Sequence, residues 1–255
     1  MTDADATAPF RLTPRAPTGR AVLLLHGFTG SPWELRLMGD SLAARGFHVV
    51  APRLPGHGTV PEAMLFVTWQ DWVASAEAAF RQLTRDFKHV SVAGLSMGGL
   101  LGLILASREA ARVRRLVLMA PVLALRAGPG RWLHRVRHTP LARAVPTWFT
   151  KAPPDLEDQV MRAQAPSPAR FPVARVLDLF SLQDLARRAV GSVRCPTLLF
   201  AAANDHVVDP RALDDLHRDV PGSRLVRLQR GYHVIPRDLD RARVISDTAD
   251  FLDEP

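Results

Sequence analysis

Short apolar segments alternate with longer amphipathic segments along most of the 255-residue chain. Runs that are apolar at consecutive positions are typical of strands buried on both faces of a parallel sheet. The predicted strands are residues 21–25, 49–51, 90–93, 116–120, 197–201 and 224–228, with a short edge strand at residues 10–12. The alternation of strands with helices predicts an α/β fold with a mostly parallel sheet and helices on both faces.

Capping residues delimit the predicted helices. Ser31 and Pro32 supply an N-cap and a first-turn proline, and Gly46 ends this helix. Thr68 and Asp71 have the spacing of a capping box, and they open a long helix that ends near residue 87. Further helices are predicted over the apolar run 100–106 and on to about residue 110, from 210 to about 220 and near 238–252.

The alternation lapses between residue 121 and about residue 193, where many prolines separate short amphipathic pieces. A stretch of about 70 residues is too long for a plain loop in a compact domain. We therefore expect residues 1–255 to form a single domain, with a small helical cap inserted at about residues 122–193.

The composition is that of an ordinary globular protein, with 47% hydrophobic and 23% charged residues. The net charge of +8 comes mostly from scattered arginines, and no basic run is interleaved with aromatic residues, so we expect no nucleic-acid partner. The densest basic stretch, residues 130–138, is interpreted as the solvated face of a cap helix. A contact to anionic substrates or lipid surfaces is the alternative.

The only cysteine, Cys195, has no partner for an internal disulfide and precedes an apolar strand, which favours a buried structural thiol. The acidic first ten residues lack the apolar core of a signal peptide. The apolar runs are too short to span a bilayer. We therefore expect a cytoplasmic protein with no integral membrane segment, and the sequence does not indicate its oligomeric state.

Residues 90–101, VSVAGLSMGGLL, place a G-x-S-x-G pentapeptide between a predicted strand and a predicted helix. Such a strand–turn–helix context displays the central serine, Ser96, at the apex of a sharp turn. Side chains at Gly94 and Gly98 would collide with the neighbouring strand or helix. The following helix directs its free N–H groups and positive dipole end toward the serine.

A serine nucleophile needs a base, and the base needs an acid that orients it. In a parallel sheet these groups lie in loops at the carboxyl ends of strands. Of nine histidines, His233 alone follows the last predicted strand. Asp205 follows the strand before it and is favoured over Asp209, because N-capping of the next helix explains Asp209.

An oxyanion formed at the substrate carbonyl needs hydrogen-bond donors that are already in place. The backbone N–H of Met97, directly after Ser96, is one candidate. The backbone N–H of Phe28, in the loop after the first buried strand, is the second. His26 in that loop is interpreted as a structural residue that holds the loop by hydrogen bonds.

The segments HGFTGSP, GLSMGG, AANDHVVDP and GYHVIP, in this order, resemble the carboxylesterase and monoacylglycerol lipase branch of the α/β-hydrolase superfamily. The resemblance extends from about residue 22 to residue 252 and is weakest in the cap. It implies Ser96 as nucleophile, Asp205 and His233 as its partners, and Phe28 and Met97 as oxyanion donors. It also implies a small helical cap over an acyl pocket, with no cofactor and no metal.

We therefore predict a serine hydrolase that cleaves small carboxylic esters with short- to medium-chain acyl groups or monoacylglycerols. A hydrolase of amide or C–C bonds and an acyltransferase would use the same residues, and a non-catalytic ligand-binding module is the alternative from another class. Candidate acyl-pocket residues in the cap are Trp132, Leu133, Leu141, Trp148 and Phe149, each of which could instead pack the cap against the core.

Overall fold

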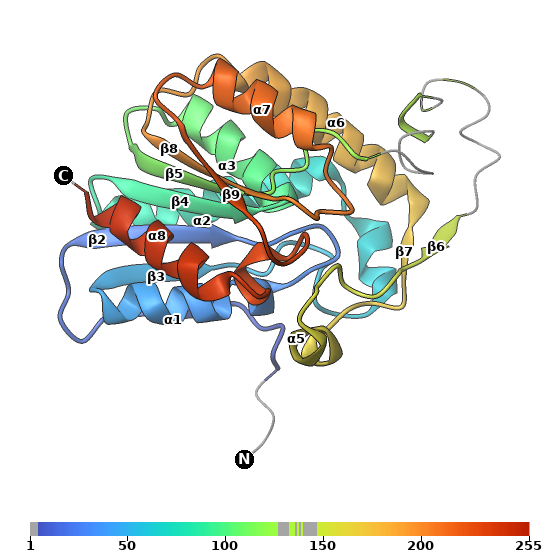
Figure 1. Cartoon of the computed structure of the whole chain (residues 1–255), viewed down its shortest axis with the longest axis horizontal. Helices are drawn as coiled ribbons and strands as arrows, with labels where there is room; N and C mark the ends of the chain where they lie inside the picture. The colour runs from blue at the N-terminus through green and yellow to red at the C-terminus, as the bar shows by residue number, and fades with distance from the viewer. Residues whose placement is uncertain (1–4, 127–132, 136, 138, 140–146, 255) are drawn as a thin grey trace.

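A seven-stranded sheet forms the centre of the part of the chain that the structure describes (Figure 1). This computed structural model describes residues 5–126, 133–135, 137, 139 and 147–254. The strand order is β1-β3-β2-β4-β5-β8-β9, and only β1 runs antiparallel to its neighbour. The strands are β1 (Phe10–Leu12), β2 (Arg20–Leu25), β3 (Phe47–Ala51), β4 (Val90–Leu95), β5 (Val113–Met119), β8 (Thr197–Ala202) and β9 (Arg224–Leu228).

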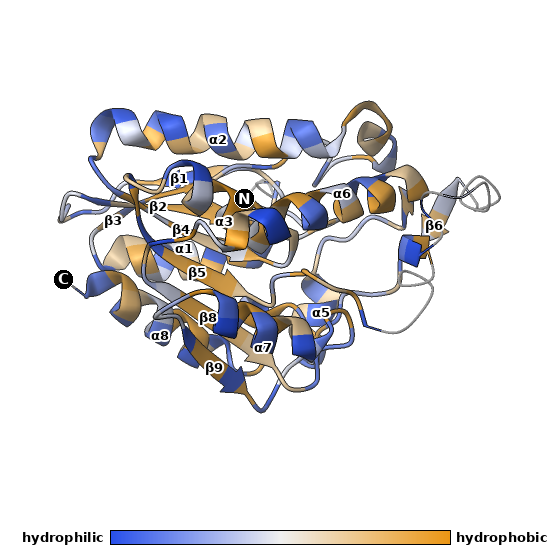
Figure 2. Ribbon diagram, turned by 90° about the horizontal axis from the view of Figure 1, so that it is seen from above, coloured by the Kyte–Doolittle hydropathy of each residue, from blue (hydrophilic) through white to orange (hydrophobic). Residues whose placement is uncertain are grey.

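Helices cover both faces of the sheet, as the alternating pattern predicts. They are α1 (Arg36–Ala44), α2 (Trp69–Asp86), α3 (Met97–Arg108), α6 (Val173–Val190), α7 (Pro210–Asp219) and α8 (Arg241–Asp253). Helices α1 and α8 pack together on one face, and α2, α3 and α6 pack together on the other. The strands lie between them as the most hydrophobic layer, whereas the outer surface of α2 is largely polar (Figure 2).

The strand register explains how consecutive apolar residues serve two cores. Leu23 pairs with Val92, and Val92 pairs with Leu116, so their side chains lie on one face of the sheet. Gly102 of α3 lies against Val92 and Leu116, which places α3 on that face. Leu24 points to the opposite face, where Gly39 of α1 approaches it. Leu23, Leu24, Val92 and Leu116 are all buried. This is expected for strands that helices cover on both faces of the sheet.

The start of the first long helix differs from the sequence expectation. A 3₁₀ turn, η1 (Pro32–Leu35), precedes α1, and the buried Ser31 hydroxyl makes no capping hydrogen bond. The predicted capping box of α2 is confirmed, since the Asp71 carboxylate accepts the Thr68 backbone N–H at 2.7 Å. Asp209 accepts the Arg211 N–H at 3.1 Å as the predicted N-cap of α7.

The segment between β5 and β8 contains a hairpin of β6 (Trp148–Thr150) and β7 (Arg170–Pro172), and the short helix α5 (Gln159–Gln164). It also contains α6, an 18-residue helix that packs on α3 and α2, whereas only short helices were expected there. Two further 3₁₀ turns are η2 (Pro61–Phe66) and η4 (Ile235–Arg237). Within the described ranges, no helix has the length and apolar character to cross a membrane.

Candidate active site

Ser96 lies at the turn between β4 and α3 in a backbone conformation with φ 54° and ψ −113°. A positive φ is uncommon for a residue with a side chain, and it marks a turn whose geometry the surroundings impose. A Cβ at Gly94 would lie 2.2 Å from the Gly98 carbonyl oxygen, and one at Gly98 would lie 2.0 Å from the Leu25 carbonyl oxygen. The two glycines therefore let β2, β4 and α3 approach closely enough to form the turn.

His233 and Asp205 come from the loops that follow the last two strands of the sheet, β9 and β8. The Nδ1 atom of His233 lies 2.8 Å from Oδ2 of Asp205, and both side chains are buried. The other carboxylate oxygen, Oδ1, accepts the backbone N–H groups of Val207 at 2.7 Å and Val208 at 2.8 Å. These bonds fix the carboxylate in the orientation that faces the imidazole.

The contact between His233 and Asp205 shifts the pKa values of both side chains. Burial alone would lower the pKa of His233, but the charge and hydrogen bond of Asp205 raise that pKa above its usual value. Burial alone would raise the pKa of Asp205, but His233 and the two loop N–H groups lower it. Asp205 is therefore ionised at neutral pH, and Nδ1 of His233 donates to it. This tautomer leaves Nε2 of His233 free to accept a proton.

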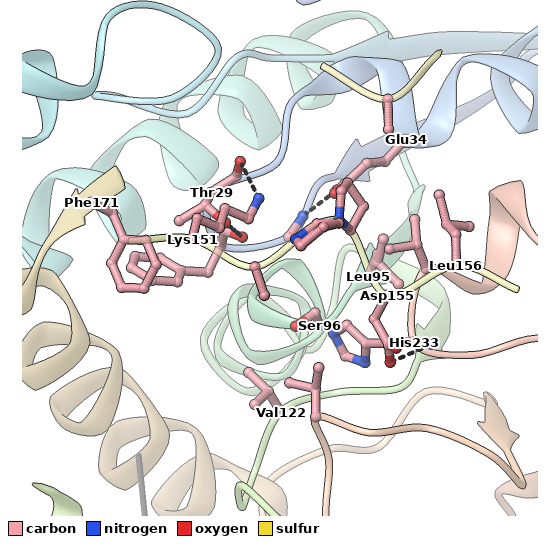
Figure 3. Close-up of a pocket in the computed structure, with 18 of the residues that line it drawn as sticks. Thr29, Glu34, Leu95, Ser96, Val122, Lys151, Asp155, Leu156, Phe171 and His233 are labelled. Carbon is pink, nitrogen blue, oxygen red and sulfur yellow. Dashed lines mark hydrogen bonds between the residues drawn. The ribbon is translucent and has the colours of Figure 1, made fainter. Parts of the chain in front are cut away.

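Ser96 and His233 lie beside one another in a cavity of about 540 Å³ (Figure 3). No hydrogen bond joins the two side chains among the described residues. Catalytic hydrogen bonds often tighten only when substrate binds, so this spacing fits a serine and a base in the free protein. The loops thus bring Ser96, His233 and Asp205, which are far apart in sequence, to one edge of the sheet.

The loop after β2 forms another wall of the cavity. His26 holds it as expected, because its Nδ1 donates to the Gly27 carbonyl at 2.9 Å and its Nε2 accepts the Leu54 N–H at 3.0 Å. Burial lowers the pKa of His26 to about 3, so this histidine stays neutral. The backbone N–H groups of Phe28, which lines the cavity, and of Met97, which directly follows Ser96, have no acceptor within the described ranges.

Comparison with known proteins assigns the chain to a family. The family model described as serine aminopeptidase, S33, matches residues 16–240. The chain belongs to this family of α/β hydrolases. A thermostable monoacylglycerol lipase of Bacillus sp. (strain H-257) is 31% identical over 91% of this chain and 89% of its own length. A carboxylesterase of Bacillus subtilis (strain 168) is 26% identical over 92% of this chain and 93% of its own.

The solved structures agree with the sequence relatives. A structure described as one of two metagenome-derived lipolytic enzymes, LipS and LipT, superposes with a TM-score of 0.87. It is 27% identical in sequence, and the superposition covers 97% of each chain. The fold is therefore that of an α/β hydrolase, and the chain is a hydrolase of the lipase and esterase family.

Glu34 lines the cavity of this S33-family hydrolase and was not predicted from the sequence. Its Oε2 accepts the Gly27 N–H at 2.8 Å, and its carboxylate occupies the space that a Cβ at Gly30 would need. Burial raises the pKa of Glu34. An acidic residue in the first helical turn is common for dipole reasons, so its position in the sequence carried no sign of this role.

Asp155, from the segment between β6 and α5, was also missed. Its Oδ2 accepts the backbone N–H groups of His206 at 3.1 Å and His233 at 3.2 Å. Its Oδ1 lies 2.8 Å from Nδ1 of His206. Asp155 thereby joins the two loops that carry Asp205 and His233, and its negative charge adds to the rise in the pKa of His233.

Asp238 holds the same region from the other side of the His233 loop. Its buried carboxylate accepts the N–H groups of Tyr232 at 2.7 Å, Asp158 at 2.9 Å and Glu157 at 3.0 Å. Gly231 has a φ of +85°, and a Cβ there would lie 2.9 Å from the Asp238 carboxyl carbon. The His233 loop therefore depends on a carboxylate that is five residues further along the chain.

One end of the cavity is apolar, because the Phe171 ring centre lies 5.6 Å from that of Phe28 and 5.9 Å from that of Phe149. Its lining includes Phe28, Phe149, Phe171, Val176 and Leu179. Of the acyl-pocket candidates named from the sequence, Phe149 lines the cavity, while Trp132 and Leu141 lie outside the described residues.

Two other acyl-pocket candidates pack elsewhere. Leu133 joins a buried cluster with Val173, Val176 and Phe180. The guanidinium of Arg170 lies 4.5 Å from the ring centre of Trp148, which does not line the cavity.

The basic stretch at residues 130–138 is described only in part. Arg137 forms an ion pair with Asp184 at 2.7 Å, and its guanidinium lies 6.0 Å from the ring centre of Phe180. Residues 130–132, 136 and 138 lie outside the described residues. Cys195 is buried as expected, and burial raises the pKa of its thiol to about 11. Among the described residues, no cluster of three or more acidic, histidine or cysteine side chains has the arrangement of a metal site.

Proposed function

We propose that this hydrolase cleaves carboxylic esters with short- to medium-chain acyl groups, including monoacylglycerols, through an acyl-enzyme on Ser96. The observation that carries the proposal is the 2.8 Å contact between His233 and the ionised Asp205, beside Ser96 at its strained turn. A serine, a histidine with a free Nε2 and a carboxylate on Nδ1 form the set of groups that acyl transfer requires.

In the first half-reaction, Oγ of Ser96 attacks the ester carbonyl while Nε2 of His233 takes the hydroxyl proton. The carbonyl oxygen becomes an oxyanion, and Asp205 stabilises the imidazolium that forms. Collapse of the tetrahedral intermediate breaks the bond to the alcohol oxygen. His233 gives its proton to that oxygen, so that the alcohol leaves and the acyl group stays on Ser96.

In the second half-reaction, His233 takes a proton from a water molecule that attacks the acyl-enzyme. A second tetrahedral intermediate forms, and its collapse returns the proton to Oγ of Ser96. The products are the free carboxylic acid and an enzyme ready for another turn.

The backbone N–H groups of Phe28 and Met97 are proposed to bind both oxyanions. Both belong to residues at the cavity or directly beside Ser96, and neither has an acceptor within the described ranges. A donor of this kind usually contributes about 10²- to 10³-fold to kcat. The hydrogen bonds of His26 and Glu34 to the loop would hold the Phe28 donor in position before substrate arrives.

The shape and lining of the cavity support an acyl substrate of limited length. A volume of about 540 Å³ fits a small ligand, and the aromatic and aliphatic residues at one end suit a hydrocarbon chain. The two Bacillus relatives are named for monoacylglycerol and carboxylic ester hydrolysis, which agrees with this substrate class.

The test is steady-state hydrolysis of p-nitrophenyl esters and monoacylglycerols of increasing chain length by the wild-type protein and Ser96→Ala. We expect hydrolysis by the wild type and a loss of about 10⁶-fold in kcat for the variant. Hydrolysis that survives Ser96→Ala would overturn the mechanism. Turnover confined to amides or diketones would favour an amide or C–C bond hydrolase. Acyl transfer to added alcohol in preference to water would favour an acyltransferase, and binding without turnover would favour a ligand-binding module.

A further inference from the structure

Lys151 is a half-buried cation in the wall of the substrate cavity. It follows directly after β6, and its backbone N–H donates to the Ala169 carbonyl at 2.9 Å, which extends the β6–β7 hairpin. Its side chain reaches across to the loop after β2, where Nζ donates to the Thr29 carbonyl at 3.3 Å (Figure 3). The hairpin thus fixes the lysine against the wall that carries Phe28.

The Lys151 ammonium makes few contacts within the described ranges. Among the described residues, the Thr29 carbonyl is the one hydrogen-bond acceptor of Nζ, and no carboxylate lies within 4.0 Å of it. A buried ammonium group is costly unless an anion or several acceptors surround it. Burial accordingly lowers the pKa of Lys151 to about 8. A cation in this state has two N–H donors left for a ligand.

Glu34 is the acidic group that acts electrostatically on Lys151, and no ion pair joins the two side chains among the described residues. One of its carboxylate oxygens is taken by the Gly27 N–H, and burial raises its pKa. His57 also interacts electrostatically with Lys151, but burial lowers the pKa of His57 to about 4, so it is neutral. Asp155 lies with His233 on the far side of Ser96 in Figure 3.

The position of Lys151 relative to Ser96 indicates which part of a substrate it would contact. The leaving alcohol must lie next to His233, which protonates it. Lys151, Thr29 and Phe171 lie on the opposite side of Ser96 from His233 in Figure 3. That side holds the aromatic residues of the apolar end, so it is the side of the acyl chain.

We propose that Lys151 forms a subsite for a negatively charged group on the acyl chain, so that the hydrolase prefers monoesters of dicarboxylic acids over neutral esters of the same length. This inference rests on the proposed ester hydrolysis at Ser96. The carboxylate would bind Nζ of Lys151 by a charge-assisted hydrogen bond while the ester carbonyl lies at Ser96. The apolar walls would contact the methylene groups between the two ends.

The test compares two matched substrates. One is the mono-p-nitrophenyl ester of adipic or suberic acid, and the other carries a carboxamide in place of the free carboxylate. The measured quantity is the ratio of kcat/KM for the acid to kcat/KM for the amide. Because both esters use Ser96 and His233, the ionisation of His233 cancels in this ratio.

Lys151→Met is expected to lower the ratio about tenfold or more, the usual size of a charge-assisted hydrogen bond. Lys151→Arg, which keeps the charge, is expected to retain a ratio above that of Lys151→Met. Lys88→Met is the matched control, since Lys88 is the exposed lysine between α2 and β4, and its ratio is expected to equal that of the wild type.

The wild-type ratio is also expected to fall as pH rises above about 8, where Lys151 loses its proton. In Lys151→Arg the ratio is expected to persist over the same range, because arginine stays protonated. An equal ratio in the wild type and Lys151→Met overturns the subsite, and so does a preference for a carboxylate on the alcohol instead of the acyl chain. If the wild type hydrolyses neither ester, the proposed function itself fails, which is a different result.

Discussion

The carboxylate of Asp155 lies against the loop that carries His233, and its Oδ2 accepts the His233 backbone N–H at 3.2 Å. The same oxygen accepts the His206 N–H, one residue after Asp205. One side chain from the segment between β5 and β8 therefore contacts both loops that supply the proposed base and acid. This contact places a negative charge near the imidazole in addition to that of Asp205.

Asp155→Asn is expected to shift the pH dependence of ester hydrolysis. The base works when His233 is neutral, so kcat/KM rises as pH rises through its pKa. Asp155 helps to raise that pKa, so its loss moves the acidic limb of the profile to lower pH. The measurement is kcat/KM against pH. The control is Asp214→Asn, on α7, where Asp214 forms an exposed ion pair with Arg227 of β9. An unchanged acidic limb in Asp155→Asn would show that Asp155 has no electrostatic effect on His233.

Asp205→Asn is expected to lower kcat by about 10⁴-fold, because the asparagine amide favours the wrong tautomer of His233. The variant keeps the size of the side chain and an oxygen for the Val207 and Val208 N–H groups. Asp209→Asn supplies the comparison, since asparagine is also a good N-cap and Asp209 begins α7. A larger loss of kcat in Asp209→Asn than in Asp205→Asn would reverse the assignment of the acid.

Gly98→Ala is expected to lower the free energy of unfolding by about 2 kcal/mol or more, as overpacked buried sites do. The new Cβ would lie 2.0 Å from the Leu25 carbonyl oxygen, and neither backbone segment has room to move. Gly191→Ala is the matched control, because that glycine has φ −64° and nothing within 4 Å of the new Cβ. Urea unfolding followed by circular dichroism measures both, and equal stabilities would contradict the tight turn.

Asp238→Ala is expected to loosen the His233 loop, because several backbone N–H groups lose their acceptor at once. Hydrogen exchange measured by mass spectrometry should show faster exchange in peptides covering residues 155–158 and 230–239. Asp247→Ala, on the exposed surface of α8, should exchange like the wild type. Protection of the loop that survives Asp238→Ala would mean that other contacts hold it.

The features that the sequence predicted are those encoded within a few neighbouring residues. The apolar runs placed the strands to within about three residues at each end, and the G-x-S-x-G segment placed Ser96 at a turn that the glycine contacts explain. His233 and Asp205 were selected because parallel strands end at one edge of a sheet. The rule applies to parallel sheets, and the sheet is mostly parallel, as predicted.

The features that the sequence did not predict depend on packing between distant segments. Asp155 contacts residues 51 and 78 positions away, and Lys151 contacts a carbonyl 122 positions away. No periodicity or capping pattern links such pairs. The long helix α6 was not predicted, because it follows a proline-rich segment and lacks a single apolar face. Some of its apolar residues pack in the main core and others pack in the cluster next to the β6–β7 hairpin. The limits of the proposed cap at residues 122–193 stay a prediction.

Covalent labelling tests whether Ser96 is the nucleophile. The wild-type protein is treated with a fluorophosphonate, and peptide mass spectrometry locates the adduct. We expect one adduct per chain at Ser96, formed far more slowly in His233→Ala because the hydroxyl then lacks its base. An unlabelled Ser96, or an adduct on another residue, in a protein that still hydrolyses esters would contradict it.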